Sequence, residues 1–223
     1  MKRYSALDFY TIQILYYKKI SKESVFTKEE FEWIQSWCDH SDKNDLPRVL
    51  LVGDSITVGY QEFVREALRN KCYVDFIATS YAIDSDIYFS VINAIVNDSK
   101  YDLIHFNNGL HGIHISAKDY KTRLENILSI FSQKSKIILA NTTIVYTSGN
   151  TNTDTPWYPI VQERNEKLSE ICKNNDYPLN DLFPISQTIK AEDRKEDGTH
   201  YKECGSKILA KAVVNKIKTE LGI

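Results

Sequence analysis

A serine that directly follows an apolar run is the first residue in this chain whose position suggests chemistry. Ser55 lies in the segment Gly53–Thr57 (GDSIT), after the run Val49–Val52 and before a helical pattern. At a strand-to-helix turn, a serine hydroxyl lies at the carboxyl edge of the sheet, where open α/β folds bind ligands. The helix N-terminus behind it offers free N–H groups and the positive end of a dipole, which stabilise an oxyanion. Ser55 is therefore a candidate nucleophile, and a helix-capping serine without chemistry is the alternative.

An aspartate and a histidine near the C-terminus could activate this serine. Asp197 and His200 form a D-x-x-H motif (DGTH) just before the last predicted helix. Two residues three positions apart can meet within one turn, so the carboxylate can bind one ring nitrogen while the other nitrogen acts as a general base. This spacing alone is common by chance. Together with the strand-end serine, it predicts a triad of Ser55, His200 and Asp197.

Asparagines follow a third apolar run. Asn107 and Asn108 come after Leu103–Phe106 and begin the segment 107–112 (NNGLHG), which includes His111. If the strand order is 2-1-3-4-5, the first and third strands are neighbours, and these amides face Ser55 across the crevice. An Asn-Gly pair is also an ordinary turn signal, so a purely structural turn is the alternative.

Alternating short apolar runs and helical stripes must position these residues. Five runs of four to six residues, each bounded by Asn, Asp, Gly or Pro, read as strands buried on both faces. They are Val49–Val52, Cys72–Ile77, Leu103–Phe106, Lys136–Ala140 and Pro178–Leu182. Helical stripes follow each run, as in Tyr120, Leu124, Ile127, Leu128 and Phe131, or in Ile87, Val91, Ala94 and Ile95. The pattern predicts an α/β fold, a three-layer α/β/α sandwich with a five-stranded parallel sheet in the flavodoxin-like order 2-1-3-4-5.

The first 47 residues do not show this alternation of apolar runs and helical stripes. Thr27 and Glu30 have the spacing of a capping box, which predicts a helix over Lys28–Trp37. We therefore expect a helical N-terminal extension over residues 1–47 and a catalytic domain over residues 48–223. The extension could simply pack on the domain, or it could form a lid or the interface of a homo-oligomer.

Composition excludes several classes of function. The net charge of −2 argues against a nucleic-acid partner. The N-terminal apolar run is broken by polar residues and is not followed by a cleavage site, which predicts neither a signal peptide nor a membrane span. Four scattered cysteines, Cys38, Cys72, Cys172 and Cys204, favour free thiols and a cytoplasmic location. His111 and His114 have a spacing that could suggest a metal, but no Cys, Asp or Glu lies in that turn, so we expect neither a metal nor another cofactor.

The serine segment, the asparagine turn and the D-x-x-H pair together resemble the SGNH (GDSL) hydrolase superfamily. The resemblance covers about residues 48–221 and includes the segments 163–165 (ERN) and 180–183 (NDLF). It implies that Ser55 attacks an ester carbonyl, that His200 moves the proton and that Asp197 orients His200. The third block resembles a branch of the family with an N-x-G-L-H turn.

The resemblance also implies an oxyanion hole, where this sequence departs from the family. The Ser55 backbone N–H is the first donor. The family's second block offers a glycine N–H, but the matching stretch 78–82 (ATSYA) has no glycine, and Ser80 is the best match. For the side-chain donor we favour Asn107, with Asn108 as second choice. Asp54, His111 and Trp157 are candidate substrate-binding residues, with Asp54 expected to hold the turn.

These residues predict a serine esterase that hydrolyses small acyl esters. The family analogy, and the absence of a long apolar stretch suited to a lipid chain, favour an acetyl group on a carbohydrate. A small molecule or glycan ester is the expected partner. An acyltransferase would use the same triad, since it differs only in whether water or a second alcohol enters. The missing glycine leaves a third alternative, a non-catalytic glycan-binding module on an esterase fold.

Overall fold

Buried strands form a single twisted sheet in the computed structural model, which describes residues 27–149 and 152–223. The strands of this part of the chain are β1 (Ile34–Trp37), β2 (Arg48–Gly53), β3 (Tyr73–Thr79), β4 (Leu103–Asn107), β5 (Lys136–Ala140) and β6 (Leu179–Asn180). Their order is β1-β3-β2-β4-β5-β6. Strands β2 to β6 pair in parallel, and β1 pairs with β3 in the antiparallel sense. The predicted parallel order is therefore confirmed, with an additional strand at one edge.

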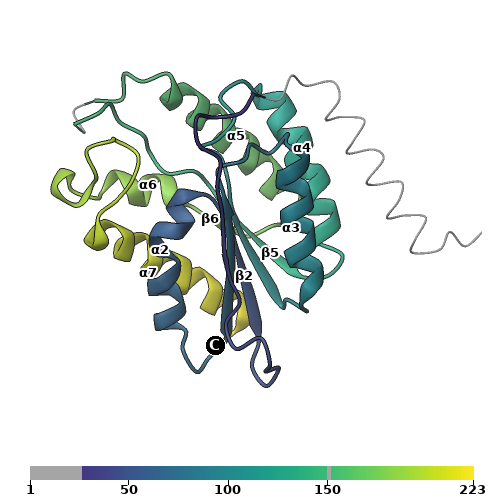
Figure 1. Ribbon diagram of the computed structural model, residues 1–223. Helices are drawn as coiled ribbons and strands as arrows, with labels where there is room; N and C mark the ends of the chain where they lie inside the picture. Colours follow the sequence, from purple (N-terminus) through teal and green to yellow (C-terminus); the bar gives the residue numbers. More distant parts are fainter. Residues whose placement is uncertain (1–26, 150–151) are drawn as a thin grey trace, which may run out of the picture.

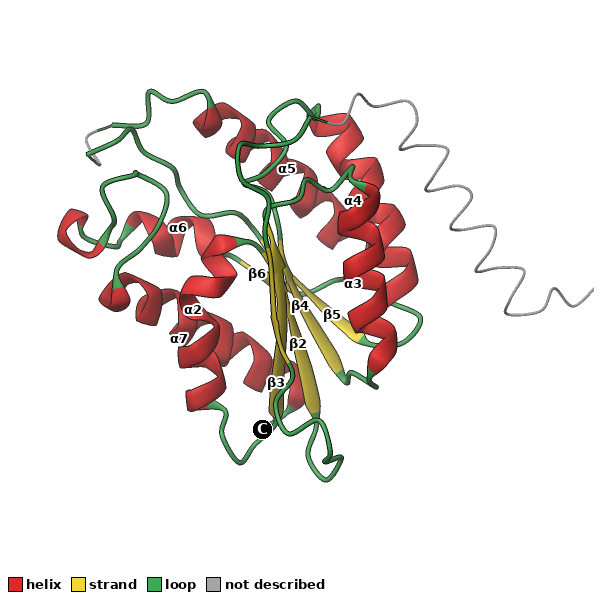
Figure 2. Cartoon of the chain, in the orientation of Figure 1, coloured by secondary structure: helices red, strands yellow, loops and turns green. Residues whose placement is uncertain are grey.

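Helices cover both faces of this sheet (Figures 1 and 2). They are α2 (Ser55–Ala67), α3 (Asp86–Asp98), α4 (Ala117–Phe131), α5 (Trp157–Asn175), α6 (Leu182–Gln187) and α7 (Glu203–Leu221), with a short 3₁₀ turn at Ala191–Asp193. Helices α2, α6 and α7 lie on one face, and α3, α4 and α5 lie on the other. The three predicted layers are thus present.

The central strand explains why the predicted strands are apolar throughout. Val49 and Leu51 of β2 pack into the cluster shared with α2 and α7, whereas Leu50 and Val52 pack into the cluster shared with α3, α4 and α5. All four side chains are fully buried. Because successive residues of a strand point to opposite faces, a strand covered on both faces needs an apolar residue at every position.

The predicted stripe of α3 is only partly correct: Val91 and Ile95 pack against the core, whereas Ala94 is exposed. Ile87 is 40% exposed, and the buried residues of the helix are instead Tyr88, Phe89, Ile92 and Val96. Both sets have helical spacing, because this helix carries apolar residues on more than one face. The larger aromatic side chains face the core, where they bury more apolar area.

The helix predicted over Lys28–Trp37 is also wrong. Residues 27–33 have no regular helix or strand, and Ile34–Trp37 forms the edge strand β1. We call residues 27–37 the arm. Its side chains and backbone bind the rest of the molecule, as when Glu32 Oε2 accepts a hydrogen bond from Ser80 Oγ at 2.8 Å, and these tertiary contacts outweigh the local helical signal. The rest of the predicted extension, residues 1–26, lies outside the described residues.

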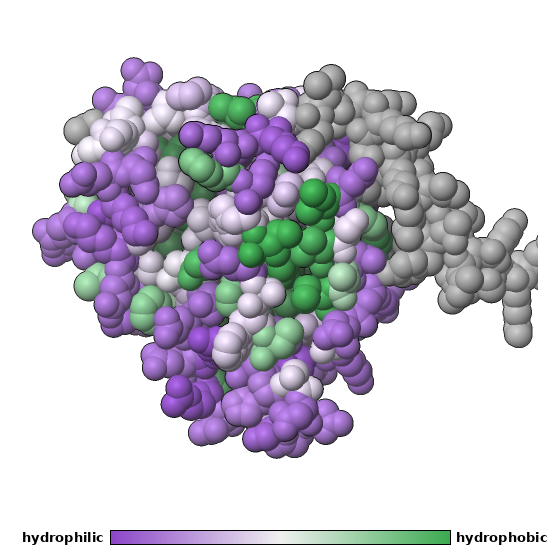
Figure 3. Space-filling view, viewed as in Figure 1, coloured by the Kyte–Doolittle hydropathy of each residue, from purple (hydrophilic) through white to green (hydrophobic). Residues whose placement is uncertain are grey.

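The surface beside the edge strand is partly apolar. Figure 3 shows hydrophobic residues gathered on the viewed face, near the edge of the sheet. Among the described residues, Phe31, Ile34, Trp37 and Ile87 are large apolar side chains with high exposure. Within the two described ranges, no helix combines the length and the apolar character that a membrane crossing requires.

Candidate active site

Ser55 occupies the first turn of α2, directly beyond the end of β2. Asp54 caps the helix: its Oδ1 accepts a hydrogen bond from the Ile56 backbone N–H at 2.9 Å. Gly53 is needed because a Cβ there would lie 1.9 Å from Thr57 Oγ1 and 2.8 Å from the Asn107 carbonyl oxygen. Ser55 is half-buried, and as the first helical residue its backbone N–H has no acceptor within the helix. This N–H and the helix dipole favour negative charge beside the Ser55 hydroxyl.

A chain of hydrogen bonds joins Ser55, His200 and Asp197. Ser55 Oγ lies 2.7 Å from His200 Nε2, and His200 Nδ1 lies 2.8 Å from Asp197 Oδ2. A carboxylate on Nδ1 fixes the tautomer in which Nε2 accepts the serine proton. The structure therefore brings together the three residues that the sequence predicted, although Ser55 and His200 are 145 positions apart.

The turn that carries Asp197 and His200 is fixed by its own backbone. Asp197 Oδ1 accepts hydrogen bonds from the backbone N–H groups of Thr199 and His200 at 2.9 and 2.8 Å. Partial burial tends to raise the pKa of Asp197, but these bonds and the His200 ring lower it below its ordinary value. Gly198 has a φ of +78°, and a Cβ there would lie 2.3 Å from the Tyr146 carbonyl oxygen. The turn thus holds an ionised carboxylate against the imidazole.

The two asparagines after β4 have different partners. Asn107 Nδ2 donates to the carbonyl oxygens of Ala140 and Asn141, at 3.2 and 3.1 Å, so both of its amide hydrogens are used. Asn108 Nδ2 is buried and has no hydrogen-bond partner among the described residues. The preference for Asn107 as the side-chain oxyanion donor therefore disagrees with the structure. Asn108, the second choice, carries the amide that can still donate.

Ser80 does not offer the second backbone donor that the resemblance implied. Its N–H donates to the Trp33 carbonyl oxygen at 3.2 Å, and its Oγ accepts from the Trp33 N–H at 2.8 Å. The arm therefore occupies the backbone group that we assigned to the oxyanion. The sequence could not reveal this, because Trp33 lies 47 positions before Ser80.

Arg164, which sequence analysis noted only as part of a motif, holds the loop after β4. This buried side chain donates from Nη1 to the carbonyl oxygens of Gly109 and His111, both at 2.8 Å. Its Nη2 donates to the Gly112 carbonyl oxygen at 2.6 Å, and its guanidinium lies 5.0 Å from the centre of the Tyr120 ring. The Asn108 carbonyl accepts a hydrogen bond from Tyr120 Oη at 2.7 Å. Arg164 and Tyr120 together fix the backbone that carries Asn108.

Comparison with solved structures gives close matches in fold. A lipase/acylhydrolase from Enterococcus faecalis matches with a TM-score of 0.66 and 19% identity, over 78% of this chain and 97% of that one. A carbohydrate acetylesterase family member from Sinorhizobium meliloti matches with a TM-score of 0.66 and 14% identity, over 80% and 100%. A member of the lipolytic G-D-S-L family from Veillonella parvula matches with a TM-score of 0.60 and 19% identity, over 75% and 96%. The fold is that of the SGNH hydrolases. No family model and no curated protein matches the sequence.

The SGNH fold gives the site its place at the carboxyl edge of the sheet. Strands β2 and β4 are neighbours in parallel register, with Val52 opposite Phe106. Ser55 and Asn108 each lie a few residues beyond these paired positions, so both are at the same edge.

The three candidate substrate-binding residues have structural partners in this SGNH fold. Asp54 is buried, and its burial raises the pKa of its carboxyl group. His111 Nδ1 lies 2.9 Å from Glu29 Oε2 of the arm. Trp157 packs at the margin of the apolar cluster shared with α2 and α7. Asp54 therefore holds the turn as expected, whereas the arm covers one ring nitrogen of His111.

A cleft of about 420 Å³ opens at Ser55. Its lining includes the candidate triad of Ser55, Asp197 and His200, together with Trp33 and Gln35 of the arm. The other lining side chains include polar Lys195 and Ser206 and apolar Ile56, Val58 and Tyr201. Trp157 is not among its lining residues. The arm, which sequence analysis left as a possible lid, is thus a wall of the cleft that contains the candidate nucleophile.

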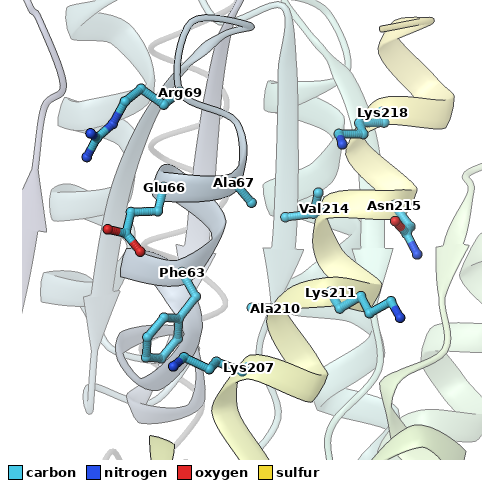
Figure 4. A pocket seen from close by; sticks show the side chains of 10 residues that line it. All are labelled: Phe63, Glu66, Ala67, Arg69, Lys207, Ala210, Lys211, Val214, Asn215 and Lys218. Carbon is cyan, nitrogen blue, oxygen red and sulfur yellow. The ribbon is translucent and has the colours of Figure 1, made fainter. Parts of the chain in front are cut away.

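A second hollow lies on the outer side of α2 and α7 (Figure 4). It has a volume of about 640 Å³ and is lined by Phe63, Lys207, Lys211 and Lys218, among others. These side chains come from α2 and α7, and among the residues that the structure describes, no Ser, His or Asp lines the hollow. The larger hollow therefore lacks the groups that ester chemistry needs.

The histidines around β4 have separate environments. Asn180 Nδ2 lies 3.0 Å from His105 Nε2, and burial lowers the pKa of His105 to about 3, so this ring is neutral. His114 Nε2 lies 2.9 Å from Asp84 Oδ2, while His111 binds Glu29. Within residues 27–149 and 152–223, no group of three or more His, Cys, Asp or Glu side chains could hold a metal ion.

Proposed function

We propose that this protein is a serine esterase that removes small acyl groups, with Ser55 as nucleophile, His200 as general base and acid, and Asp197 as the residue that orients His200. The observation that carries this proposal is the continuous hydrogen-bond chain from Asp197 through His200 to Ser55 Oγ. Two bonds of 2.7 and 2.8 Å at the end of a strand supply the general-base geometry of acyl transfer.

The reaction follows from these positions. Ser55 Oγ attacks the ester carbonyl carbon while His200 Nε2 takes the hydroxyl proton. The tetrahedral intermediate then collapses, the bond to the alcohol oxygen breaks, and His200 returns the proton to that oxygen. Water attacks the acyl-serine by the same route, which releases the acid and restores the Ser55 hydroxyl. Asp197, held ionised by its backbone hydrogen bonds, stabilises the imidazolium in each step.

The oxyanion of this intermediate would be stabilised by two groups of the chain. The first is the Ser55 backbone N–H at the positive end of α2. The second is the Asn108 amide, since it is buried and its nitrogen has no partner in the described part of the chain. A buried, unpaired amide costs free energy in the resting protein, and a developing negative charge would satisfy it.

An acetyl ester of a carbohydrate is the substrate class that the site favours. One structural neighbour is described as a carbohydrate acetylesterase family member. The cleft at Ser55 combines polar side chains, among them Gln35, Lys195 and Ser206, with apolar surface from Trp33, Ile56, Val58 and Tyr201. Such a mixed lining suits a sugar alcohol, which has both hydroxyl groups and C–H faces.

Hydrolysis of p-nitrophenyl acetate by the wild type and by Ser55→Ala tests the proposal. We expect the substitution to reduce kcat by several orders of magnitude while circular dichroism shows an unchanged fold, because only oxyanion and binding effects remain. We also expect acetate and butyrate esters to react faster than esters of about twelve carbons, since a cleft of about 420 Å³ is small among ligand sites and has polar side chains among its apolar ones. A wild type that hydrolyses none of these esters would indicate a binding module.

A further inference from the structure

The arm presents alternate side chains to helix α2. In a strand, residues two apart share a face. Trp33 and Gln35 line the cleft that contains Ser55, while the ring of Trp37 lies 5.1 Å from the Arg65 guanidinium near the other end of α2. The arm therefore runs along α2, with Trp33 and Gln35 at the cleft of Ser55 and Trp37 beside Arg65.

The backbone of Trp33 is fixed on both sides. Its N–H donates to Ser80 Oγ at 2.8 Å, and its carbonyl oxygen accepts from the Ser80 N–H at 3.2 Å and from Thr79 Oγ1 at 2.7 Å. Its side chain packs against the apolar cluster of α2 and α7. A flat aromatic surface is thus held in position before any ligand arrives, so little conformational entropy would be lost on binding.

The lining of the cleft shows which part of an ester it would hold. His200 and Asp197 line it, whereas no residue of the loop 107–112 does, although that loop carries Asn108. The cleft therefore opens on the side of His200. Because His200 must return its proton to the departing oxygen, the alcohol part of the ester has to lie on this side.

The chemistry of this wall fits a sugar ring. One face of a pyranose presents C–H groups, which pack on an aromatic ring, and its edge presents hydroxyl groups, which need polar partners. Trp33 supplies an aromatic ring, and Gln35, Lys195 and Ser206 supply polar groups in the same cleft. Ile56, Val58 and Tyr201 add apolar surface for the C–H face of a sugar. A volume of about 420 Å³ lies in the range of small-molecule sites.

We propose that Trp33 and Gln35 of the arm form the subsite for the sugar alcohol of the ester, so that the N-terminal segment determines substrate specificity. This inference rests on the proposed esterase function and extends it. Both residues belong to the arm, where the sequence predicted a helix: Trp33 directly precedes the edge strand β1, and Gln35 lies within it. The arm would thereby select esters whose alcohol is a ring with hydroxyl groups over esters of small alcohols.

The test compares a monoacetylated methyl xyloside with ethyl acetate, whose alcohol has no ring to pack on Trp33 and no further hydroxyl group. For Trp33→Leu, which keeps apolar volume without a flat ring, we expect the ratio of kcat/KM for the sugar ester over ethyl acetate to fall about tenfold, mainly through KM. Trp33→Phe should restore most of the ratio. Gln35→Leu, at an exposed position that cannot disturb the core, should lower it about threefold through a lost hydrogen bond.

Trp37→Leu is the matched control, because Trp37 lies on the same face of β1 but outside the cleft. We expect this variant to keep the wild-type ratio. If the wild type hydrolyses neither ester, the proposed function itself fails. If the wild type hydrolyses both and the ratio survives Trp33→Leu and Gln35→Leu, or falls equally in Trp37→Leu, the esterase stands and the subsite is refuted.

Discussion

Asn107 and Asn108 are adjacent and have the same side chain, but their amide groups have different hydrogen-bond partners and therefore different roles. Asn107 joins the end of β4 to the end of β5 through two carbonyl acceptors. Asn108 carries a buried amide nitrogen without a partner among the described residues. Asn107 therefore stabilises the sheet edge, and Asn108 is the residue that we propose as an oxyanion donor.

Replacing each of the two asparagines by alanine separates these roles. We expect Asn108→Ala to lower kcat by roughly 10²–10³ with little change in KM, because the oxyanion exists only in the transition state. We expect Asn107→Ala to lower the free energy of unfolding by about 2 kcal/mol, because it leaves two buried carbonyl groups without a donor. Steady-state kinetics and urea unfolding measure the two effects. A larger loss of kcat in Asn107→Ala than in Asn108→Ala would reverse the assignment.

The sequence was informative about residues whose role depends on their place in an element. Ser55 follows a strand, and Asp197 and His200 precede the last helix, so type and position could identify all three. The choice between Asn107 and Asn108 depends on which amide meets the carbonyl groups of Ala140 and Asn141, 33 and 34 positions away from Asn107. No local pattern contains that information.

At the scale of elements, helix α5 determines the shape of the loop after β4. Arg164 reaches from α5 to the carbonyl groups of Gly109, His111 and Gly112, and its Nη2 lies 3.4 Å from the Ile115 carbonyl oxygen. Burial lowers the pKa of Arg164, yet these acceptors keep its positive charge compensated within the fold. The loop that carries Asn108 is therefore formed by contact with a helix more than 40 residues later.

Arg164→Met should weaken both stability and catalysis. The substitution removes the hydrogen bonds of Arg164 to the carbonyl groups of Gly109, His111 and Gly112. We expect a loss of about 3 kcal/mol in the free energy of unfolding, and a lower kcat as Asn108 loses its position. Lys173→Met is the control, since Lys173 is exposed on the same helix. Urea denaturation and ester kinetics would report the changes, and equal behaviour of the two variants would argue against this role.

The elements that the sequence misjudged are those fixed by tertiary contact. The capping-box spacing of Thr27 and Glu30 favours a helix, but the arm gains a strand partner in β3, where Ile34 pairs with Thr79. In a short segment with exposed side chains, the local preference for a helix is weak, so pairing with a neighbouring strand can outweigh it. The apolar runs of β2 to β5 were predictable because a strand covered on both faces leaves an unbroken apolar signature.

At the scale of the whole molecule, an ion pair ties the arm to the active-site loop. Glu29 Oε2 lies 2.9 Å from His111 Nδ1, and the Gly112 N–H is directed at Glu29 Oε1. Burial alone would lower the pKa of His111, but the hydrogen bond to Glu29 and the negative charges of Asp54, Glu29 and Glu32 raise it. Burial alone would raise the pKa of Glu29, but its bonds to His111 lower it.

The contribution of this pair to stability should depend on pH. The stabilisation that comes from the Glu29 carboxylate is fully present above the ordinary pKa of 4.5. It is lost as pH falls through the lowered pKa of Glu29 in the folded protein. The stabilisation that comes from the protonated His111 ring is fully present below the ordinary pKa of 6.5. It is lost as pH rises through the raised pKa of His111 in the folded protein. We therefore expect Glu29→Gln to reduce the free energy of unfolding by about 1 kcal/mol between pH 4.5 and pH 6.5, the two ordinary pKa values. The reduction should be smaller at lower and at higher pH. Urea unfolding across this range measures it, and a difference independent of pH would contradict the pair.

Labelling with a fluorophosphonate tests most directly whether His200 activates Ser55 as a nucleophile. This reagent reacts with an activated serine hydroxyl, and mass spectrometry of the digested protein locates the adduct. We predict one adduct on the peptide that contains Ser55, none in Ser55→Ala, and labelling slowed at least about a hundredfold in His200→Ala, because the general base is lost. Labelling of Ser55 at the same rate in wild type and His200→Ala, or no labelling of the folded wild type, would contradict this activation.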